Sequence, residues 1–286
     1  MTTQLATRAA RADTARAASL LAAPLLWLLV VYVGALAALL VTSFYGIDSF
    51  TNQVVHTFTL DNFIDVFGDP AYLRAAARTI GVATAVTVVC AAMALPMSFY
   101  MARIAAPSRR SALVALVLTP LWASYLVKVY AWRTMLTPGS GVLAWLLGPL
   151  HISSPGYGMA GVVITLAYLW LPYMVLPVYA GLERLPASLM DASADLGASF
   201  GTTMRSVVLP ILKPAVIAGS IFTFSLSLGD YITVQIVGGK NQMLGNIVYQ
   251  NFSLNLPFAA AVSVIPVAIM MVYLAAVRRT GALENL

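Results

Sequence analysis

Residues 79–101 read TIGVATAVTVVCAAMALPMSFYM, a run of 23 positions without a charged side chain. A helix needs about 20 apolar residues to cross the hydrocarbon core of a bilayer. No water is available at that depth, so every backbone N–H and C=O group must be bonded within the protein, which a helix achieves. This stretch therefore predicts a transmembrane helix and sets the fold class of the chain.

Five further stretches of similar length and apolar character surround it. Together they predict six transmembrane spans, at about residues 20–41, 79–101, 112–135, 161–182, 215–237 and 257–277. The third is the least apolar, because Lys128 and Arg133 lie in its second half. A transmembrane β-barrel would show segments of about ten alternating residues instead of continuous apolar runs. The predicted fold class is therefore an all-α polytopic membrane protein.

The composition of the whole chain agrees with this class. Of its 286 residues, 60% are hydrophobic and 9% are charged, against about 45–50% and about 25% in an average soluble domain. So few charges cannot cover a water-facing surface, which excludes a soluble globular enzyme, and the apolar content excludes disorder. The single cysteine, Cys90, excludes an internal disulfide. With only two histidines, His56 and His151, we expect no metal site.

Lysine and arginine residues are distributed unequally between the two sides of the predicted bundle. Eleven of the sixteen fall on one side: Arg8, Arg11, Arg16, Arg103, Arg109, Arg110, Arg184, Arg205, Lys213, Arg278 and Arg279. Three fall on the other side, Arg74, Arg78 and Lys240. Since cytoplasmic segments carry the excess of cations, we expect both termini in the cytoplasm. The net charge of +6 is then explained without a nucleic-acid partner.

The predicted domain organisation follows from the spans and their orientation. Residues 1–19 form a cytoplasmic tail, residues 20–277 one transmembrane domain, and residues 278–286 a second cytoplasmic tail. The first apolar stretch, of about 22 residues, exceeds the roughly 7–15 of a cleaved signal peptide, so we expect it to remain as a helix. The longest cytoplasmic loop covers residues 183–214, between the fourth and fifth spans.

This loop reads ERLPASLMDASADLGASFGTTMRSVVLPILKP and carries the signals of two short helices. Ser188, with a carboxylate three residues later, is a variant of the capping box that opens a helix. Gly197 predicts a left-handed stop at the end of that helix. Ser199 is placed to cap a second helix, which we expect to end near Pro210. A rigid pair of helices at the membrane face suits docking into a partner protein.

The same loop resembles the EAA loop of the permeases of binding-protein-dependent ABC importers. That motif reads Glu-Ala-Ala, three residues, Gly, nine residues and Ile-x-Leu-Pro. This chain matches its spacing at residues 191–193, 197 and 207–210, which read Asp-Ala-Ser, Gly and Val-Val-Leu-Pro. The departures are Asp for Glu, Ser for Ala and Val for Ile. Six spans with this loop between the fourth and fifth are similar to a type I importer permease over most of the chain.

The resemblance implies that residues 188–210 dock on a separate ATPase subunit. The positions that would make or shape this contact are Asp191, Ala192, Ser193, Gly197, Phe200, Met204, Arg205, Leu209 and Pro210. Gly197 would form the elbow of the loop. Asp191 and Arg205 would be its polar anchors. Phe200 and Met204 would be its apolar contacts.

The resemblance also implies the surroundings of the chain. It would lie in the inner membrane of a bacterium, as one half of a heterodimer with a second homologous permease. Two ABC ATPase subunits and an extracytoplasmic substrate-binding protein would complete the importer. The chain itself would bind no cofactor, because ATP would be used by the partner subunits, and its sequence has no Gly-x-x-x-x-Gly-Lys-Ser/Thr phosphate-binding run. We therefore expect a transport subunit and not an enzyme.

Asp230 is the clearest ionisable residue in an apolar segment, and such residues are functional candidates because burying a charge in a membrane is costly. Its carboxylate would attract a cationic substrate, and Tyr231 beside it would offer a ring face to the same cation. Alternatively, Asp230 pairs inside the protein with Lys128 or Arg133. The residues alone leave both interpretations open.

The runs SLGDY, VGGK and LGN between residues 227 and 246 resemble the spermidine/putrescine permeases, most of all the first of their two permease components. This resemblance implies polyamine import, with opines, amino acids or another small solute as the alternative. A self-sufficient secondary transporter is more remote, because no second half resembles the first. A membrane enzyme would need clustered histidines, cysteines or carboxylates, which the sequence lacks.

Overall fold

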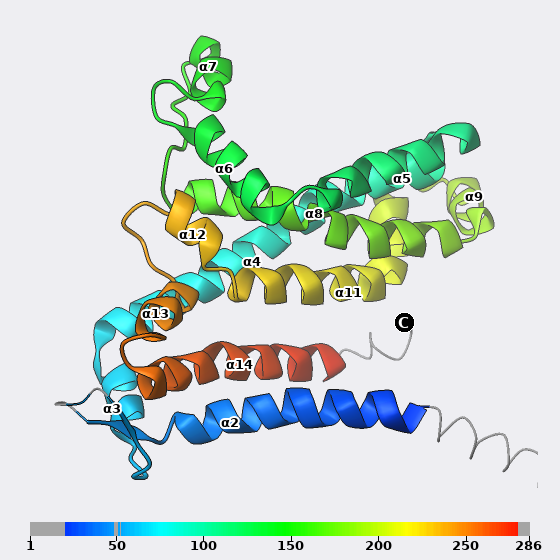
Figure 1. The fold of residues 1–286 in the computed structure, drawn as a ribbon. Helices are drawn as coiled ribbons and strands as arrows, with labels where there is room; N and C mark the ends of the chain where they lie inside the picture. The colour runs from blue at the N-terminus through cyan, green and yellow to red at the C-terminus, as the bar shows by residue number, and fades with distance from the viewer. Residues whose placement is uncertain (1–20, 49–50, 52, 280–286) are drawn as a thin grey trace, which may run out of the picture. The chain divides into compact units, whose positions relative to one another are not determined.

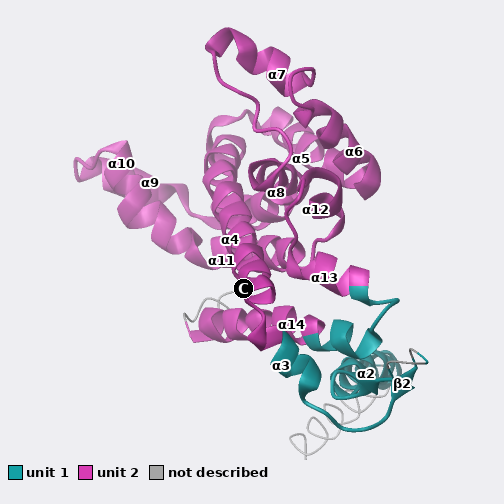
Figure 2. Cartoon of the chain, turned by 90° about the vertical axis from the view of Figure 1, so that its left-hand side faces the viewer, with its two compact units in different colours: residues 1–65, 251–261 teal, residues 66–250, 262–286 magenta. Residues whose placement is uncertain are grey.

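The computed structural model describes residues 21–48, 51 and 53–279 (Figure 1). Over these residues the chain is almost entirely helical, as predicted, and the one sheet in the described part is a two-stranded hairpin. The chain divides into two compact units, residues 1–65 with 251–261 and residues 66–250 with 262–286 (Figure 2). The second unit contains both regions that the sequence singles out for function.

The first unit is built on an apolar helix that runs from Leu21 to Thr42. Within it, a π-helical turn, η1 (Leu29–Val33), leads into α2 (Gly34–Thr42). The strands β1 (Gly46–Ile47) and β2 (Val54–Val55) then pair antiparallel. No residue in the most apolar window of the helix is buried by the rest of the chain, as expected for a span whose surroundings are apolar lipid.

One side chain ties the end of this helix to the residues after the hairpin. Asn62 lies in the first turn of α3 (Asp61–Gly68). Its Nδ2 donates to the carbonyl oxygens of Ser43 (3.0 Å) and Tyr45 (2.8 Å). Two otherwise unpaired backbone acceptors are therefore bonded where the helix stops, as a buried chain end requires.

Among the described residues, five helices are long and apolar enough to cross a membrane, and a bent pair of helices adds a possible sixth, in the order that the sequence predicts. Five are continuous helices: Leu21–Thr42, Pro70–Ile104, Met159–Arg184, Phe200–Leu228 and Leu256–Arg279. The sixth counts only if a bent pair of helices, Pro107–Trp122 and Tyr125–Met135, is taken as one span. The predicted number of spans is therefore reached only with a broken one.

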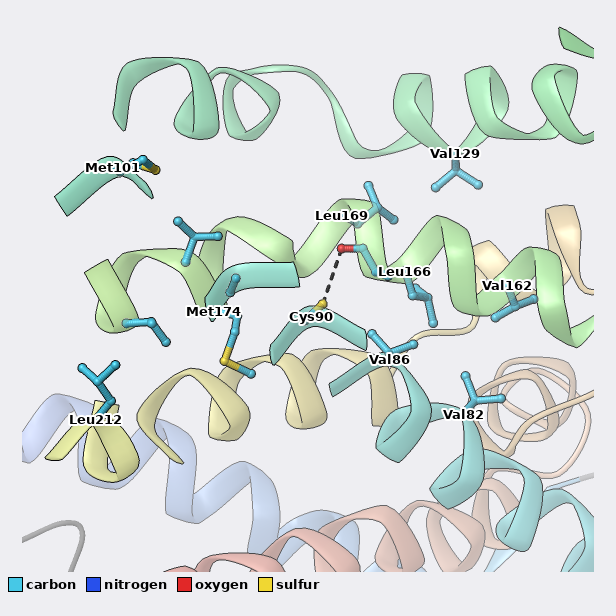
Figure 3. Packing of buried hydrophobic residues seen from close by; sticks show 14 of the residues in the cluster. Val82, Val86, Cys90, Met101, Val129, Val162, Leu166, Leu169, Met174 and Leu212 are labelled. Atoms are coloured by element: carbon cyan, nitrogen blue, oxygen red, sulfur yellow. Dashed lines mark hydrogen bonds between the residues drawn. The ribbon is translucent and has the colours of Figure 1, made fainter. Parts of the chain in front are cut away.

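The core of the second unit lies among α4 (Pro70–Phe99), α8 (Met159–Arg184) and α11 (Leu209–Leu228) (Figure 3). Apolar side chains without exposed surface come from α4 and α8: Val86, Cys90, Val162, Leu166 and Met174. The thiol of Cys90 donates to the carbonyl oxygen of Ala167 at 3.5 Å. The helices α5, α6 and α12, whose bounds are given below, contact α8 of this core.

Small residues let α8 and α11 approach each other closely. A Cβ added at Gly219 would lie 2.6 Å from Met174 Sδ and 3.0 Å from Met174 Cα. A Cβ added at Gly181 would lie 3.0 Å from the Cβ of Ala215. Such close backbone approach through glycine is typical of helix pairs in membranes.

The third predicted span, residues 112–135, is not one straight helix. It consists of α5 (Pro107–Trp122) and α6 (Tyr125–Leu136), which meet at 93°. Lys128 Nζ donates to the carbonyl oxygen of Pro120 at 3.0 Å. That carbonyl lies in the last turn of α5, where no helical N–H remains to bond it and where the helix dipole favours a cation. Lys128, whose charge makes this span less apolar than the others, thus stabilises the break between α5 and α6.

The fifth predicted span, residues 215–237, is wrong at both ends. The helix begins earlier, in α10 (Phe200–Thr203), and passes through a π-helical turn, η4 (Met204–Val208), into α11. It ends at Leu228, and a break of three residues separates it from α12 (Ile232–Val237). Asp230 therefore lies in an interruption of the span and not along a helix.

The expectation that the second loop helix ends near Pro210 is also wrong, because Pro210 lies in the first turn of α11. A proline ring normally clashes with the carbonyl four residues before it. Here the preceding turn is wider, with the Leu209 N–H bonded to the carbonyl of Met204 five residues back. A π-helical turn changes the regular spacing at which that clash arises, so the helix continues through the proline.

Short elements join the spans. η2 (Tyr100–Ile104) is a π-helical extension of α4. Between α6 and α8 lie α7 (Val142–Leu147) and the 3₁₀ turn η3 (Gly148–Leu150). α13 (Leu244–Asn251) follows α12 and precedes α14 (Leu256–Arg279). The two predicted tails, residues 1–19 and most of 278–286, lie outside the described residues.

Candidate functional site

The cytoplasmic segment after α8 starts with a helix, but not at the predicted cap. α9 (Ala187–Asp195) has Pro186 at its N-cap position and no side-chain cap. Ser188 lies inside the helix, so its predicted capping role is wrong. The fixed φ of proline already suits the approach to a helix, which leaves the serine unused.

The elbow of this segment forms at Gly197, as predicted. Gly197 has φ of +78°, a left-handed conformation that costs glycine nothing. Its N–H bonds to the carbonyl of Ala194 at 2.8 Å, and the N–H of Ala198 bonds to the carbonyl of Ser193 at 3.1 Å. This pair of bonds is the Schellman arrangement that closes a helix on a left-handed residue.

The second helix starts at the predicted cap and is tied to the first. Ser199 Oγ accepts a hydrogen bond from the backbone N–H of Thr202 at 3.4 Å. The hydroxyls of Ser193 and Thr203 are 2.8 Å apart, so a hydrogen bond links α9 to α10. The helix, elbow and helix therefore form one defined shape and not a loose loop.

Most side chains that the family resemblance assigns to the ATPase contact point outward. Those exposed are Asp191, Ala192, Gly197, Phe200, Arg205, Leu209 and Pro210, while Ser193 and Met204 are half-buried. Phe200 is 64% exposed, although one edge of its ring meets Phe99 at 5.6 Å between centroids. Leu196, which the sequence analysis did not single out, is 89% exposed directly before the elbow. An apolar side chain this exposed in water favours a partner surface.

Two hollows lie beneath this segment, where it meets the membrane helices. One, of about 490 Å³, is lined by Leu95, Pro96, Phe99, Ile104, Leu182, Phe200, Met204, Val208, Leu209 and Leu212. The other, of about 630 Å³, is lined by residues of α8, α9 and α11, among them Leu189 and Pro210. The segment contacts the bundle through Met190 and Met204, which pack against the buried core.

Asp230 is held by side chains from two different helices. It is 7% exposed. Its Oδ1 accepts the backbone N–H of Thr233 at 2.9 Å, and its Oδ2 accepts the Thr233 hydroxyl at 3.3 Å. The hydroxyl of Tyr125, the first residue of α6, donates to Oδ2 as well and lies 2.8 Å from the Thr233 hydroxyl. The break in the fifth span is therefore bonded to the break in the third.

The predicted internal partners of Asp230, Lys128 and Arg133, are not its partners. Lys128 caps the end of α5, as described above. The guanidinium carbon of Arg133 lies 5.8 Å from the ring centre of Tyr157. Both cations are directed elsewhere by the 93° bend between α5 and α6, which the sequence analysis treated as one helix.

One face of the Tyr231 ring is covered by another ring and is not available to a substrate. Its ring stacks on that of Tyr249, with centroids 4.7 Å apart. Its carbonyl accepts from Asn246 Nδ2 at 3.0 Å. It still lines a hollow of about 200 Å³ beside Asp230, whose other walls are Tyr125, Trp170, Leu226, Gly229 and Ile232. This hollow combines one carboxylate with three aromatic rings.

Sequence reasoning missed two residues of this cluster, for different reasons. Thr233 follows Asp230 by three positions, the spacing at which a carboxylate caps a helix, so the start of α12 was readable. Tyr125 lies 105 positions away. Read as part of a continuous span, it is an ordinary packing residue, and no local pattern connects it to Asp230.

The extent of one family match decides the membership of this chain. Residues 18–280 match the family described as the binding-protein-dependent transport system inner membrane component. The chain belongs to this family. It is the permease subunit of an ABC importer, a multi-pass protein of the inner membrane, and a transport subunit without catalytic activity of its own. The family resemblance seen in the cytoplasmic loop is thereby confirmed.

Two curated relatives from Escherichia coli (strain K12) are similar over most of their length. The inner membrane ABC transporter permease protein YdcU is 43% identical, over 93% of this chain and 90% of the relative. The spermidine/putrescine transport system permease protein PotB is 31% identical, over 85% of this chain and 90% of the relative. Of these two names, only that of PotB states a substrate.

Solved structures share the fold at much lower identity. A permease chain of a bacterial ABC transporter for the acidic polysaccharide alginate superposes with a TM-score of 0.72 and 14% identity, covering 93% of this chain and 98% of that one. A chain of the MetNI methionine ABC transporter reaches 0.57 and 18% identity, covering 73% and 94%. These neighbours confirm the predicted fold class, a helical permease of type I importers.

Proposed function

We propose that this importer permease carries an amine-bearing solute, with polyamines as the leading class. The observation behind the proposal is the buried carboxylate of Asp230, at the edge of a hollow walled by Tyr125, Trp170 and Tyr231. A carboxylate among aromatic faces is a chemical match for an alkylammonium group. The spermidine/putrescine permease PotB, at 31% identity, supports the same class. Opines, amino acids or another small solute form the second candidate.

The proposal includes how transport is driven. The segment of residues 188–210 docks on an ABC ATPase subunit, with the elbow at Gly197 and the exposed Leu196 at the contact. The complete importer has a second, homologous permease in a heterodimer, two ATPase subunits and an extracytoplasmic substrate-binding protein. The partners named for solved relatives support this assembly, since one of them is described in complex with a substrate-bound periplasmic protein.

A pull-down in mild detergent tests the assembly. The tagged chain is expressed with the proteins of its own system, and the recovered partners are identified by mass spectrometry. An ATPase and a non-identical permease are expected. Recovery of the chain alone, under conditions in which a known importer stays intact, contradicts the proposed assembly and favours a self-sufficient transporter.

A matched pair of variants tests the docking surface in the same experiment. Leu196→Asp puts a charge at the proposed contact, and Leu150→Asp makes the same change at a side chain that is 65% exposed on the opposite side of the membrane. Recovery of the ATPase should fall roughly 30-fold for Leu196→Asp, as for a docking residue worth about 2 kcal/mol. It should be unchanged for Leu150→Asp. Equal recovery with both variants contradicts docking at the elbow.

Uptake by the complete system tests the substrate class. Cells lacking other polyamine uptake should accumulate labelled putrescine or spermidine when they express the whole importer. An excess of opines or amino acids should not compete. Accumulation of a labelled opine or amino acid, with no accumulation of labelled polyamine, replaces polyamines with that second class.

A further inference from the structure

Three cations that the sequence analysis places on the extracytoplasmic side of this permease lie together. Arg74, Arg78 and Lys240 are the exceptions to the cytoplasmic excess of lysine and arginine. All three line one hollow of about 260 Å³, although Arg78 and Lys240 are far apart in the sequence. The residues that line the hollow belong to the first turns of α4, the loop after α12 and the start of α13. Arg74 and Arg78 share a face of α4 because they are four residues apart, whereas Lys240 is brought to them by the fold.

The walls of the hollow are held in place by bonds between these elements. Arg78 Nη1 donates to the carbonyl oxygen of Gln242 at 2.9 Å. The backbone N–H of Leu244 donates to Thr79 Oγ1 at 3.0 Å. The loop that carries Lys240 is therefore fixed against α4. The cations are held close together in spite of their mutual repulsion.

No carboxylate lines this hollow, all of whose residues are described. The lining consists of the three cations with Ala71, Tyr72, Ala75, Gln242 and Ile247. Asp69, the acid nearest in sequence, uses its Oδ1 to accept the backbone N–H of Ala71 at 2.7 Å, as the cap of α4. The side chains of Arg74 and Lys240 are exposed. Their positive charge is thus available to an anion from outside the chain.

The depth of the hollow in the membrane indicates which anion. The helix Pro70–Ile104 is continuous, and Arg103 near its far end bonds the carbonyls of Leu182 and Leu185 on the cytoplasmic side. At 1.5 Å per residue, Arg78 and Arg74 lie roughly 38 and 44 Å from Arg103 along the helix. A bilayer with its headgroups is about 40–45 Å thick. The helix is therefore long enough for Arg103 and the hollow to reach the headgroup regions of opposite leaflets.

From this charge, lining and depth, we propose that Arg74, Arg78 and Lys240 bind the phosphate headgroup of an anionic phospholipid of the outer leaflet. The cations face the phosphate. Tyr72, a residue type that favours the interface, and the apolar Ala71, Ala75 and Ile247 line the same hollow and suit the glycerol and the start of the acyl chains. The bound lipid would tie α4 to the loop between α12 and α13.

Thermal unfolding of the purified complex in mild detergent tests this proposal. Added phosphatidylglycerol should stabilise the complex more than phosphatidylcholine with the same acyl chains. In the double variant Arg74→Gln with Lys240→Gln, the phosphatidylglycerol concentration for half-maximal stabilisation should rise roughly 25-fold, at about five-fold per cation. Arg78 is left intact because it bonds the loop backbone. Lys240→Gln alone, with roughly a five-fold shift, serves if the double variant folds poorly.

The control is Arg278→Gln with Arg279→Gln, which removes two cations at the cytoplasmic end of α14 and should leave the response unchanged. An equal loss in this control overturns the proposal, as does an unchanged response in the double variant. An equal effect of glycerol phosphate overturns the lipid as ligand. If the double variant keeps the lipid response but loses binding of the extracytoplasmic protein, the hollow is a protein-docking site and the proposal is wrong.

Discussion

Two interruptions of helix in this permease, at Gly197 and at Gly229, have opposite surroundings. At Gly197 the turn is closed by backbone bonds between neighbours in sequence, and the adjacent Leu196 is 89% exposed. At Gly229 the chain leaves α11, and the adjacent Asp230 is 7% exposed and bonded to α6 and α12. The first interruption can therefore meet another protein without change to its own fold. The second cannot alter without disturbing the contact between two broken spans.

The largest effect is expected at the exposed interruption, Gly197. Gly197→Asp should lower uptake roughly 30-fold and weaken association with the ATPase, because a carboxylate would be placed in the docking contact. No atom outside the local chain lies within 4 Å of a Cβ at this position, so membrane insertion should be preserved. Gly197→Asn, equally tolerant of the left-handed conformation, is the uncharged match and should lose less. Normal uptake by a stable Gly197→Asp variant would refute the docking role.

At the buried interruption, next to Gly229, loss of the Asp230 charge is expected to lower uptake more than loss of one of its hydrogen bonds. Asp230→Asn keeps an oxygen that can accept the Thr233 N–H but loses the negative charge. Uptake of a cationic substrate should fall roughly ten-fold, equivalent to about 1.4 kcal/mol of charge-assisted binding. Initial rates over a range of substrate concentrations measure this. Unchanged kinetics would remove Asp230 from the substrate pathway.

Tyr125→Phe tests the hydrogen bond between α6 and Asp230 without removing the carboxylate charge. It removes the hydroxyl that links α6 to Asp230 and leaves the carboxylate bonded to Thr233. The free energy of unfolding should fall by about 1–2 kcal/mol, since the lost bond is to a charged group. Substrate affinity should change by less than about three-fold if charge alone attracts the substrate. An affinity loss as large as that of Asp230→Asn would show that the hydrogen bond between Tyr125 and Asp230, and not the carboxylate charge, governs transport.

The smallest effect is expected at the hydrogen bond that links the two helices of the cytoplasmic segment, residues 188–210. Ser193→Ala removes the hydrogen bond between the hydroxyls of Ser193 and Thr203, which links α9 to α10. Stability should fall by about 0.5–1 kcal/mol, as for a typical neutral hydrogen bond. ATPase recovery in the pull-down should be nearly unchanged, because the elbow is closed by backbone bonds. A large loss of recovery would show that the cytoplasmic segment also depends on side-chain contacts for its shape.

The same contrast explains which parts of the fold could be predicted. The spans were readable because each apolar run of about 20 residues has only one stable conformation in lipid. The left-handed Gly197 and the cap at Ser199 were readable because such motifs involve residues within a few positions of each other. The breaks at residues 123–124 and 229–231 were not, since both lie inside stretches whose hydropathy is that of a continuous span.

The candidate site divides in the same way. The cytoplasmic segment that we propose to dock on the ATPase was found because its family pattern is continuous in the sequence. Asp230 was found because a carboxylate in an apolar run is conspicuous. The internal pairing with Lys128 or Arg133, one of the two interpretations left open, is not found, because the third span bends between α5 and α6. Tyr125 was interpreted as a packing residue, because aromatic residues in spans usually pack.

By itself, the sequence determined the class of protein, the order of its apolar spans and the shape of the cytoplasmic elbow. These depend on transfer into lipid and on bonds between near neighbours, both of which are local. Only the tertiary structure decided that Tyr125 bonds to Asp230, that Lys128 caps α5, and that Arg74, Arg78 and Lys240 share one hollow. These contacts depend on how the broken helices bend and pack, and no local pattern specifies that.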